Sequence, residues 1–418
     1  MLRSTPATPL YIAMRAVNAF AFALVLTYEL VYQTTVVGLN PFQLVLVGVV
    51  LESMTFFFEI PTGMLADLYS RRLAVILGIL LTGAGFLIEG LVPTFAFVLA
   101  GQVLWGIGFT FYSGAETAWL ADEIGMEHMH TVLLRATQIA QVCTIAGTFA
   151  GAALSRVATV APILTGAALY LLLGVALSMV MPEHGFQPAP RDERHNIWQH
   201  LTQPFAESAR LVRVHPLLWM ILLLGVIIGL SLGGFDRLYT PHLLQDFLFP
   251  SGMDLEPTAW PGMINGVVAV TSLVGMEVVR RRARTSDQAV IIRLLIGMYS
   301  GMLVGSALFA AMHDFSWAIG GFVLSQTLRN VSRPLLIVWI NQNAAPRVRA
   351  TVISTYWQAN AFGQIIGSPA LGWLATVRTL RLALEVGTAV YIATLPLLLL
   401  AQRRWTRMQR AADTNNGR

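Results

Sequence analysis

Charged, amide and aromatic residues recur at helical spacing in a stretch near the start of the sequence. They are Arg15, Asn18, Phe22, Glu29 and Tyr32, which follow one another at steps of three, four, seven and three. Such steps place side chains on one face of an α-helix. An arginine presents a planar fork of hydrogen-bond donors to a carboxylate or phosphate, and a glutamate can take up or release a proton. This face therefore has the groups needed to bind a charged organic molecule or to handle a proton.

Two further stretches carry faces of the same kind. The first contains Gln102, Trp105, Phe109, Tyr112, Glu116 and Trp119, and the second contains Phe322, Gln326, Arg329 and Arg333. A fourth stretch holds Asp236 next to Arg237. Adjacent residues do not share a helix face, so we expect a different partner for each, and a purely structural ion pair is an open alternative. For the aromatic residues the alternative is packing in the core or at a lipid interface.

The elements that hold these residues must be membrane-spanning helices. The chain has 418 residues, of which 56% are hydrophobic and only 12% are charged, and its mean hydropathy is +0.65. A soluble domain carries about 25% charged residues. Half of that charge does not cover a soluble surface, so most of this surface must face lipid. The composition predicts an all-α polytopic membrane protein and excludes a soluble enzyme.

Apolar segments of about 20 residues have the length that a helix needs to cross a bilayer. We predict twelve spans, near 10–35, 43–64, 73–91, 95–119, 131–154, 160–181, 216–240, 259–279, 289–311, 315–340, 350–375 and 382–402. The polar segment 182–215 separates the first six from the last six. We therefore expect an N-terminal six-helix bundle over 1–181, a cytoplasmic linker with a surface helix broken near Pro204, and a C-terminal six-helix bundle over 216–418.

The arginines orient these spans. All 27 basic residues are arginines: four lie within predicted spans, three (Arg156, Arg378 and Arg381) lie on one side, and the other twenty lie on the opposite side or in the tails. Because basic residues are concentrated in cytoplasmic segments, the asymmetry predicts that both termini are cytoplasmic. The net charge of +5 is spread over short loops, so it gives no sign of a nucleic-acid partner.

The two halves share short sequence matches. RATQIAQ begins at Arg135 and RATVIST begins at Arg349, and Gly63-Met64 recurs as Gly275-Met276. Matches at nearly one offset, at equivalent ends of spans, favour a duplication. Two six-span halves of the same orientation are parallel repeats, an architecture typical of transporters that rock two bundles around a central site.

The stretch 59–72 reads EIPTGMLADLYSRR and closes the second span with Gly63, Asp67, Arg71 and Arg72. The pattern Gly63-x-Leu65-Ala66-Asp67-x-x-x-Arg71-Arg72 resembles the signature loop between helices two and three of the major facilitator superfamily. FFFEIPTG and FYSGAETAWLADEIG are similar to a bacterial branch often described as drug or multidrug exporters. Span count, central loop and half-repeat extend the resemblance over essentially the whole chain, but they say little about the substrate.

The resemblance implies that spans one, four, seven and ten line a central cavity. It also implies that Asp67, Arg71 and Arg72 form a clasp between helices two and eleven that opens and closes during transport. Without the family, Pro61 and Gly63 are expected to weaken the helix end and permit a turn or a close helix contact. The chain departs from the family at Leu68 and Ser70, and at Gln102, where many proton-coupled exporters carry an arginine. These departures weaken the case for proton antiport from motifs alone.

Charges within spans are functional candidates, because a charged side chain at mid-bilayer costs about 2.5–3.5 kcal/mol. Glu29 and Glu52 are the leading candidates for proton coupling, and Asp236 is the third. Glu89, Glu116 and Glu277 lie near span ends, where an interfacial position is an equally good interpretation. Arg329 and Arg333 have two open interpretations: binding an anionic part of a substrate, or neutralising Glu29 or Glu52.

The sequence thus predicts a secondary active transporter of a small, amphipathic organic solute, and favours a proton-driven exporter. Open alternatives are an uptake symporter, a lipid or lysolipid transporter, and a membrane receptor or scaffold. No HExxH or Walker motif occurs, so we expect no enzyme activity, metal or other cofactor. The expected partners are the solute, the lipid bilayer and a proton or other cation, and the expected form is a monomer in a bacterial-type plasma membrane. Predicted cavity residues are Arg15, Asn18, Phe22, Tyr32, Gln102, Trp105, Phe109, Tyr112, Glu116, Arg237, Gln326, Arg329 and Arg333.

Overall fold

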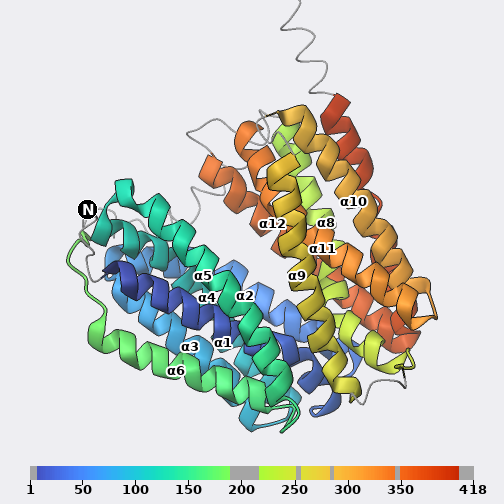
Figure 1. The fold of residues 1–418 in the computed structure, drawn as a ribbon, viewed down its shortest axis with the longest axis horizontal. Coiled ribbons are helices and arrows are strands. Elements are labelled where there is room, and N and C mark those ends of the chain that lie inside the picture. The colour runs from blue at the N-terminus through green and yellow to red at the C-terminus, as the bar shows by residue number, and fades with distance from the viewer. Residues whose placement is uncertain (1–6, 189–215, 251–255, 283–286, 344–348, 404–418) are drawn as a thin grey trace, which may run out of the picture. The chain divides into compact units, whose positions relative to one another are not determined.

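The computed structural model describes residues 7–188, 216–250, 256–282, 287–343 and 349–403, and these are helical with short connections (Figure 1). The predicted surface helix near Pro204 lies outside the described residues. The long helices are α1 (Ala7–Thr35), α2 (Pro41–Leu68), α3 (Arg71–Leu91), α4 (Phe95–Ile124), α5 (Met126–Leu154), α6 (Ala161–Val180), α8 (Pro216–Gln245), α9 (Trp260–Arg282), α10 (Gln288–Ala311), α11 (Phe315–Asn343), α12 (Arg349–Val377) and α13 (Leu380–Tyr391).

The helices follow the predicted spans closely, and the all-α polytopic fold is confirmed. The last span differs most, since α13 ends at Tyr391 and the chain turns at 392–393 before it is helical again up to 403. Ten helical segments among the described residues are long and apolar enough to cross a membrane. α11 and α12 do not reach that apolarity, and both carry charged or amide side chains: Gln326, Arg329, Asn330 and Arg333 on α11, and Gln358, Asn360 and Gln364 on α12.

Local sequence signals set the helix boundaries. Asn40 and Gln43 form a capping box at the start of α2, in which each side chain bonds the other's backbone N–H. Ser70 caps α3 through its side-chain oxygen, which accepts from the Leu73 N–H. Gly125 has φ of +77°, a conformation that favours glycine, and it allows α4 to stop and α5 to begin within a single residue.

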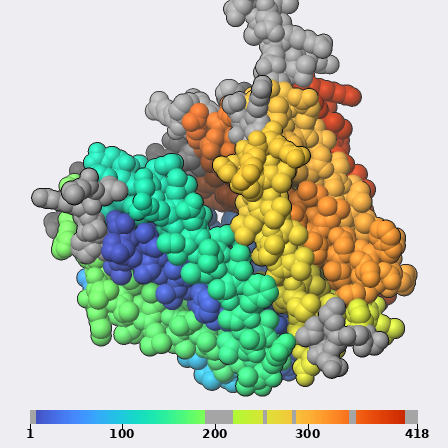
Figure 2. Space-filling view, viewed as in Figure 1, coloured from blue at the N-terminus to red at the C-terminus, as the bar shows by residue number. Residues whose placement is uncertain are grey.

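The described helices form two compact units. α1–α6 belong to the first unit, α8 and α10–α13 belong to the second, and α9 is divided after Gly266. In the first unit, α1 packs against α5 and α6, and α3 packs against α4 and α6. In the second unit, α8 packs against α12 and α13, and α10 packs against α11 and α13. Figure 2 shows the surface of the first unit, with α1 (blue) between α5 (teal) and α6 (green).

Close glycine contacts repeat in the two units and fix their register. Gly85 and Gly101 bring α3 and α4 together, and Gly305 and Gly321, both 220 residues later, do the same for α10 and α11. Gly147 of α5 lies against the Phe20 carbonyl of α1, as Gly363 of α12 lies against the Val226 carbonyl of α8. These pairs correspond at offsets of 216 for the glycines and 206 for the carbonyls. These correspondences favour the predicted duplication, but the matching RAT motifs, 214 residues apart, stand two residues out of the register that the glycines give.

We predict that Gly101→Ala lowers the free energy of unfolding by about 1–3 kcal/mol, since overpacking a tight contact costs that much. A methyl group at Gly101 would lie 2.7 Å from the Gly85 carbonyl oxygen and 3.2 Å from Glu89 Cβ, so α3 and α4 would have to separate. Thermal unfolding in detergent measures the change. Gly114→Ala on the same helix is the control, because a methyl group there meets no atom within 4 Å. Equal stability of the two variants would contradict the importance of the contact.

Candidate functional site

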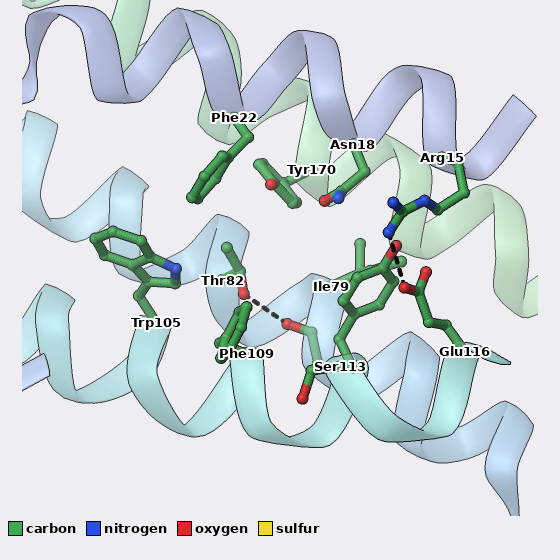
Figure 3. Close-up of a pocket in the computed structure, with 12 residues that line it drawn as sticks. Arg15, Asn18, Phe22, Ile79, Thr82, Trp105, Phe109, Ser113, Glu116 and Tyr170 are labelled. Carbon is green, nitrogen blue, oxygen red and sulfur yellow. Dashed lines mark hydrogen bonds and ion pairs between the residues drawn. The ribbon is translucent and has the colours of Figure 1, made fainter. Parts of the chain in front are cut away.

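A cavity of about 270 Å³ lies within the first unit, between α1, α3, α4 and α6. In Figure 3 the side chains of Arg15, Asn18 and Phe22 project from α1 toward Trp105, Phe109 and Glu116 of α4. Seven of the predicted cavity residues line it: Arg15, Asn18, Phe22, Trp105, Phe109, Tyr112 and Glu116. The sequence analysis missed the contributions of α3 and α6, which are Gly78, Ile79, Thr82 and Tyr170, and also Ser113 of α4.

An ion pair spans this cavity and joins α1 to α4. The guanidinium of Arg15 donates to Glu116 Oε1 at 2.8 Å, and the two side chains are 30% and 7% exposed. The other carboxylate oxygen of Glu116 and the Tyr112 hydroxyl are buried without a hydrogen-bond partner among the described residues. Glu116 is therefore part of a polar centre inside the unit, and the interfacial interpretation of this residue is wrong.

Aromatic rings form the other end of the cavity. Trp105 meets Phe22 edge-on, with 5.8 Å between ring centroids, and lies 5.1 Å from the ring of Phe86. Phe86 in turn contacts Tyr170 of α6 at 5.7 Å. Such rings offer a large apolar contact area with a defined geometry. The cavity thus has a charged end and an aromatic end.

Beyond the aromatic end, four buried polar side chains form a cluster that we call the acid–amide quartet: Glu29, Gln33, Glu89 and Gln102. Gln33 Nε2 donates to Glu29 Oε1 at 3.1 Å and to Glu89 Oε1 at 2.7 Å. Gln102 Nε2 donates to Glu29 Oε1 at 2.7 Å and to Glu89 Oε2 at 3.0 Å. Each of the four residues is at most 2% exposed.

The quartet changes two sequence interpretations. Gln102 belongs to the quartet and does not line the cavity of the first unit, and Tyr32 lies beside the quartet, with its hydroxyl donating to the Glu89 carbonyl oxygen at 3.0 Å. The assignment of both residues to a central cavity stays a prediction. Glu89 is fully buried, so its interfacial interpretation is also wrong. Gln33 was missed, although it follows Glu29 by one helical turn, a spacing that places both on one face of α1.

In the second unit, Arg329 of α11 binds Asp236 of α8 through both of its terminal nitrogens, with Nη2 at 2.6 Å from Oδ2. The two side chains are 13% and 35% exposed. The partner of Arg329 within its own unit is therefore Asp236, and neutralisation of Glu29 or Glu52 of the first unit by Arg329 stays a prediction. Arg333 follows one helical turn later with an exposed side chain. The structure thus brings together two of the predicted charged residues, Asp236 and Arg329, and places a second arginine beside them.

Three other predicted residues are half-buried. They are Arg237 on α8, Gln326 on α11 and Glu52 on α2. Glu52 does not line the cavity of the first unit. Its assignment as a coupling residue stays a prediction, as do the cavity assignments of Arg237 and Gln326.

The loop between α2 and α3 holds a charged network within the first unit. Arg71 donates to Asp67 at 3.0 Å and to both carboxylate oxygens of Asp122, on α4, at 2.7 Å. The carboxylate of Glu183, just after α6, accepts from the Arg72 N–H at 2.9 Å and from the Ser70 hydroxyl at 2.7 Å. Asp122 and Glu183 were missed by the sequence analysis, although Asp122 lies in the FYSGAETAWLADEIG segment.

Gly63 forms neither of the two local features expected of it, a turn or a close helix contact. α2 continues as a helix through Pro61 and Gly63 to Leu68, and a methyl group at Gly63 would meet no atom within 4 Å. The residue therefore makes neither a turn nor a close helix contact in the described structure. The clasp between Asp67 and the eleventh helix stays a prediction.

Comparison with known proteins accounts for this arrangement. The family model of the major facilitator superfamily matches residues 8–368, which is most of the chain. The chain belongs to the major facilitator superfamily. A curated superfamily relative, the uncharacterized MFS-type transporter YxaM of Bacillus subtilis (strain 168), is 20% identical over 358 residues, which cover 85% of this chain and 86% of YxaM.

Solved superfamily structures share the fold. The nucleoside transporter NupG matches with a TM-score of 0.74 at 12% identity, over 95% of this chain and 99% of NupG. A POT family transporter in complex with 5-aminolevulinic acid matches with a TM-score of 0.73 at 12% identity, over 97% of both chains. A bacterial homolog of the human lysosomal transporter Spinster matches with a TM-score of 0.71 at 12% identity, over 96% and 97%. At these identities the likeness establishes the fold alone, and the family establishes a multi-pass membrane transporter.

Proposed function

We propose that this protein is a secondary active exporter of a small, amphipathic organic solute, driven by the proton gradient through alternating access. The observation that carries this proposal is the cavity of the first unit, which has the Arg15–Glu116 pair at one end and the rings of Phe22 and Trp105 at the other. Ligand sites combine apolar walls with a few placed polar groups in this way. A solute with an aromatic or alkyl part and a charged or zwitterionic head would match both ends.

The proposal includes a place and an orientation for the protein. The arginine distribution supports cytoplasmic termini, and we propose a monomer in a bacterial-type plasma membrane as the working unit. The network of Asp67, Arg71 and Asp122 supports a gating role for this loop, because charge-assisted bonds of this kind hold helix ends together and can be broken in turn.

Transport into proteoliposomes with an imposed pH gradient tests the function and its direction. In antiport, solute moves against the proton flow, so it should accumulate in liposomes with an acidic lumen; a symporter would instead fill liposomes with an alkaline lumen. The panel contains aromatic quaternary cations, aromatic sulfonates and zwitterions with a quaternary ammonium group, because a permanent charge prevents the passive trapping of weak bases and weak acids. Protein-free liposomes are the control. Accumulation of no panel member above that control would contradict the proposal.

A further inference from the structure

The acid–amide quartet occupies a niche whose counterpart in the second unit is apolar. The offsets fixed by the glycine contacts are 206 from α1 to α8 and 220 from α3 and α4 to α10 and α11. With these offsets, the residues of the second unit that correspond to Glu29, Gln33, Glu89 and Gln102 are, in that order, Phe235, Tyr239, Phe309 and Phe322. These rings pack on one another: Phe309 and Phe322 lie 5.0 Å apart, Phe235 and Phe309 5.7 Å, and Tyr239 and Phe322 4.9 Å.

The comparison shows that the fold does not need polar groups at this position. A niche of the same helices is filled in the second unit by aromatic side chains, and Phe235, Phe309 and Phe322 are at most 4% exposed. Burial of carboxyl and amide groups is costly compared with well-packed apolar groups. Proteins retain such locally unfavourable choices chiefly at functional sites. The presence of four buried polar groups at this position is therefore best explained by a ligand or ion that they bind.

The geometry of the quartet limits what that can be. Each amide nitrogen donates to both carboxyl groups, which brings carboxyl oxygens of Glu29 and Glu89 within about 6 Å of each other. Two carboxylates this close do not both ionise readily when buried. The carbonyl oxygens of Gln33 and Gln102 are also buried, and neither has a hydrogen-bond donor in the described structure. A carboxylic acid, unlike a carboxylate, supplies an O–H donor.

We propose that the acid–amide quartet is a proton-binding site, in which Glu29 and Glu89 share one exchangeable proton that is taken up and released during transport. A proton on either carboxyl group removes one of two adjacent negative charges and gives the quartet a donor for an unpartnered amide oxygen. This assignment rests on the proposed proton-driven function and identifies its coupling site. Glu89, which the sequence analysis left open, becomes an equal partner of Glu29.

Few other ionisable groups face this part of the unit. The helices packed against the quartet carry few other titratable or charged side chains near it: Tyr28 and Tyr32 of α1, Cys143 of α5, Arg156 in the turn after α5, and Tyr170 of α6. Along α2, the first titratable residue is Glu52. Tyr32 bonds the backbone of Glu89 rather than its carboxyl group. The two glutamates are thus the groups of this half best placed to exchange a proton near neutral pH.

An aromatic layer connects the quartet to the cavity. Phe86 stands three residues before Glu89 on α3, Trp105 three residues after Gln102 on α4, and Phe22 seven residues before Glu29 on α1. These intervals place each ring on the same helix face as its polar neighbour. Trp105 contacts both other rings and also lines the cavity. The rings therefore form a continuous path of contacts between a solute in the cavity and the quartet.

Glu29→Gln and Glu89→Gln test the site in the full-length protein. Exchange of labelled solute across liposomes without a pH gradient needs no net proton movement, so we expect both variants to lose less of this exchange than of gradient-driven accumulation. Gradient-driven accumulation should fall to the level without a gradient. At zero membrane potential a gradient of two pH units can support about hundredfold accumulation per coupled proton, so the loss is large. Glu59→Gln, at an exposed glutamate of α2, is the matched control.

Wild-type accumulation in both quartet variants would overturn the proposal. Accumulation driven by a Na⁺ gradient at equal pH, and lost in the same variants, would also overturn it by showing that the site holds a metal cation. Infrared difference spectroscopy of the purified protein keeps the site testable if no solute is transported. A protonated carboxyl band near neutral pH should be present in wild type and Glu59→Gln and absent from both quartet variants. Absence of that band from wild type would contradict the shared proton directly.

Discussion

Asp236→Asn is expected to lower the free energy of unfolding by about 3 kcal/mol. Removing one partner of a buried ion pair costs about 3–5 kcal/mol, because the other charge is left buried without compensation. Here that charge is Arg329, whose side chain is only 13% exposed, and Arg333 follows one turn later. The 35% exposure of Asp236 allows some screening by solvent, which places the effect at the lower end of that range.

Thermal unfolding and size-exclusion chromatography in detergent measure this loss. Asp236→Asn combined with Arg329→Gln should regain most of the stability, since a neutral hydrogen-bonded pair replaces the ion pair and no charge is stranded. Glu277→Gln is the matched control, because Glu277 is exposed and binds the exposed Arg280 and Arg281 on the same helix. We expect no measurable change for it. If Asp236→Asn is as stable as this control, Asp236 does not stabilise the second unit.

Glu116→Gln should reduce kcat/KM for transport by about a hundredfold, which corresponds to about 2.7 kcal/mol. Truncating one member of a desolvated charge pair at a binding site costs about 2–5 kcal/mol. Glu116 lines the cavity at 5% exposure and pairs there with Arg15, so a charged part of a bound solute would meet both groups. Arg15→Gln should have a similar effect, because it leaves Glu116 as a buried, unpaired carboxylate.

The double variant Arg15→Gln/Glu116→Gln separates two explanations of that loss. If both charges contact the solute, the double variant should remain as inactive as the single variants. If the pair only ties α1 to α4, neutralising both partners should restore transport, and its place in the binding site would be refuted. Concentration-dependent uptake into proteoliposomes gives the rates, and thermal unfolding shows whether each variant is folded.

Much of the fold was predictable, because hydrophobic spans and their polar connections follow directly from the bilayer as a solvent. The break after Tyr391 was missed although the sequence signals it, because Pro396 has no N–H to bond the carbonyl of Ile392 and its ring clashes with that carbonyl. The predicted second span, 43–64, already included Pro61, but α2 continues to Leu68 because Pro61 does not end the helix. The RAT motifs indicated the repeat but gave an offset two residues too short. Three identical residues define the register less well than glycines that are held against the backbone of a neighbouring helix.

The sequence predicted which residues of the candidate site share one helix face, but not which residues of different helices contact each other. Spacing on α1 and α4 identified seven residues that line the cavity, because one helix face can be read from periodicity. Pairing between helices depends on how the helices approach each other, and no periodicity contains that information. Arg329 therefore had several carboxylates as possible partners in the sequence, and Glu89 could not be placed beside Glu29. Asp122 and Glu183 escaped for the same reason, since they meet Arg71 and the N–H of Arg72 only after α4 and α6 have packed.

The helices α3 and α4 touch backbone to backbone at Gly78 and Gly108 as well as at Gly85 and Gly101, and Arg71 bonds Asp122 near one end of the pair. Two rods joined at three points along their length cannot slide or tilt independently. Spin labels at the exposed positions Leu73 of α3 and Phe97 of α4 would thus form an internal ruler of constant length, against which the changing separations of other labelled positions can be read. The chain suits such labelling, since Cys143 is its sole native cysteine and a single replacement removes it.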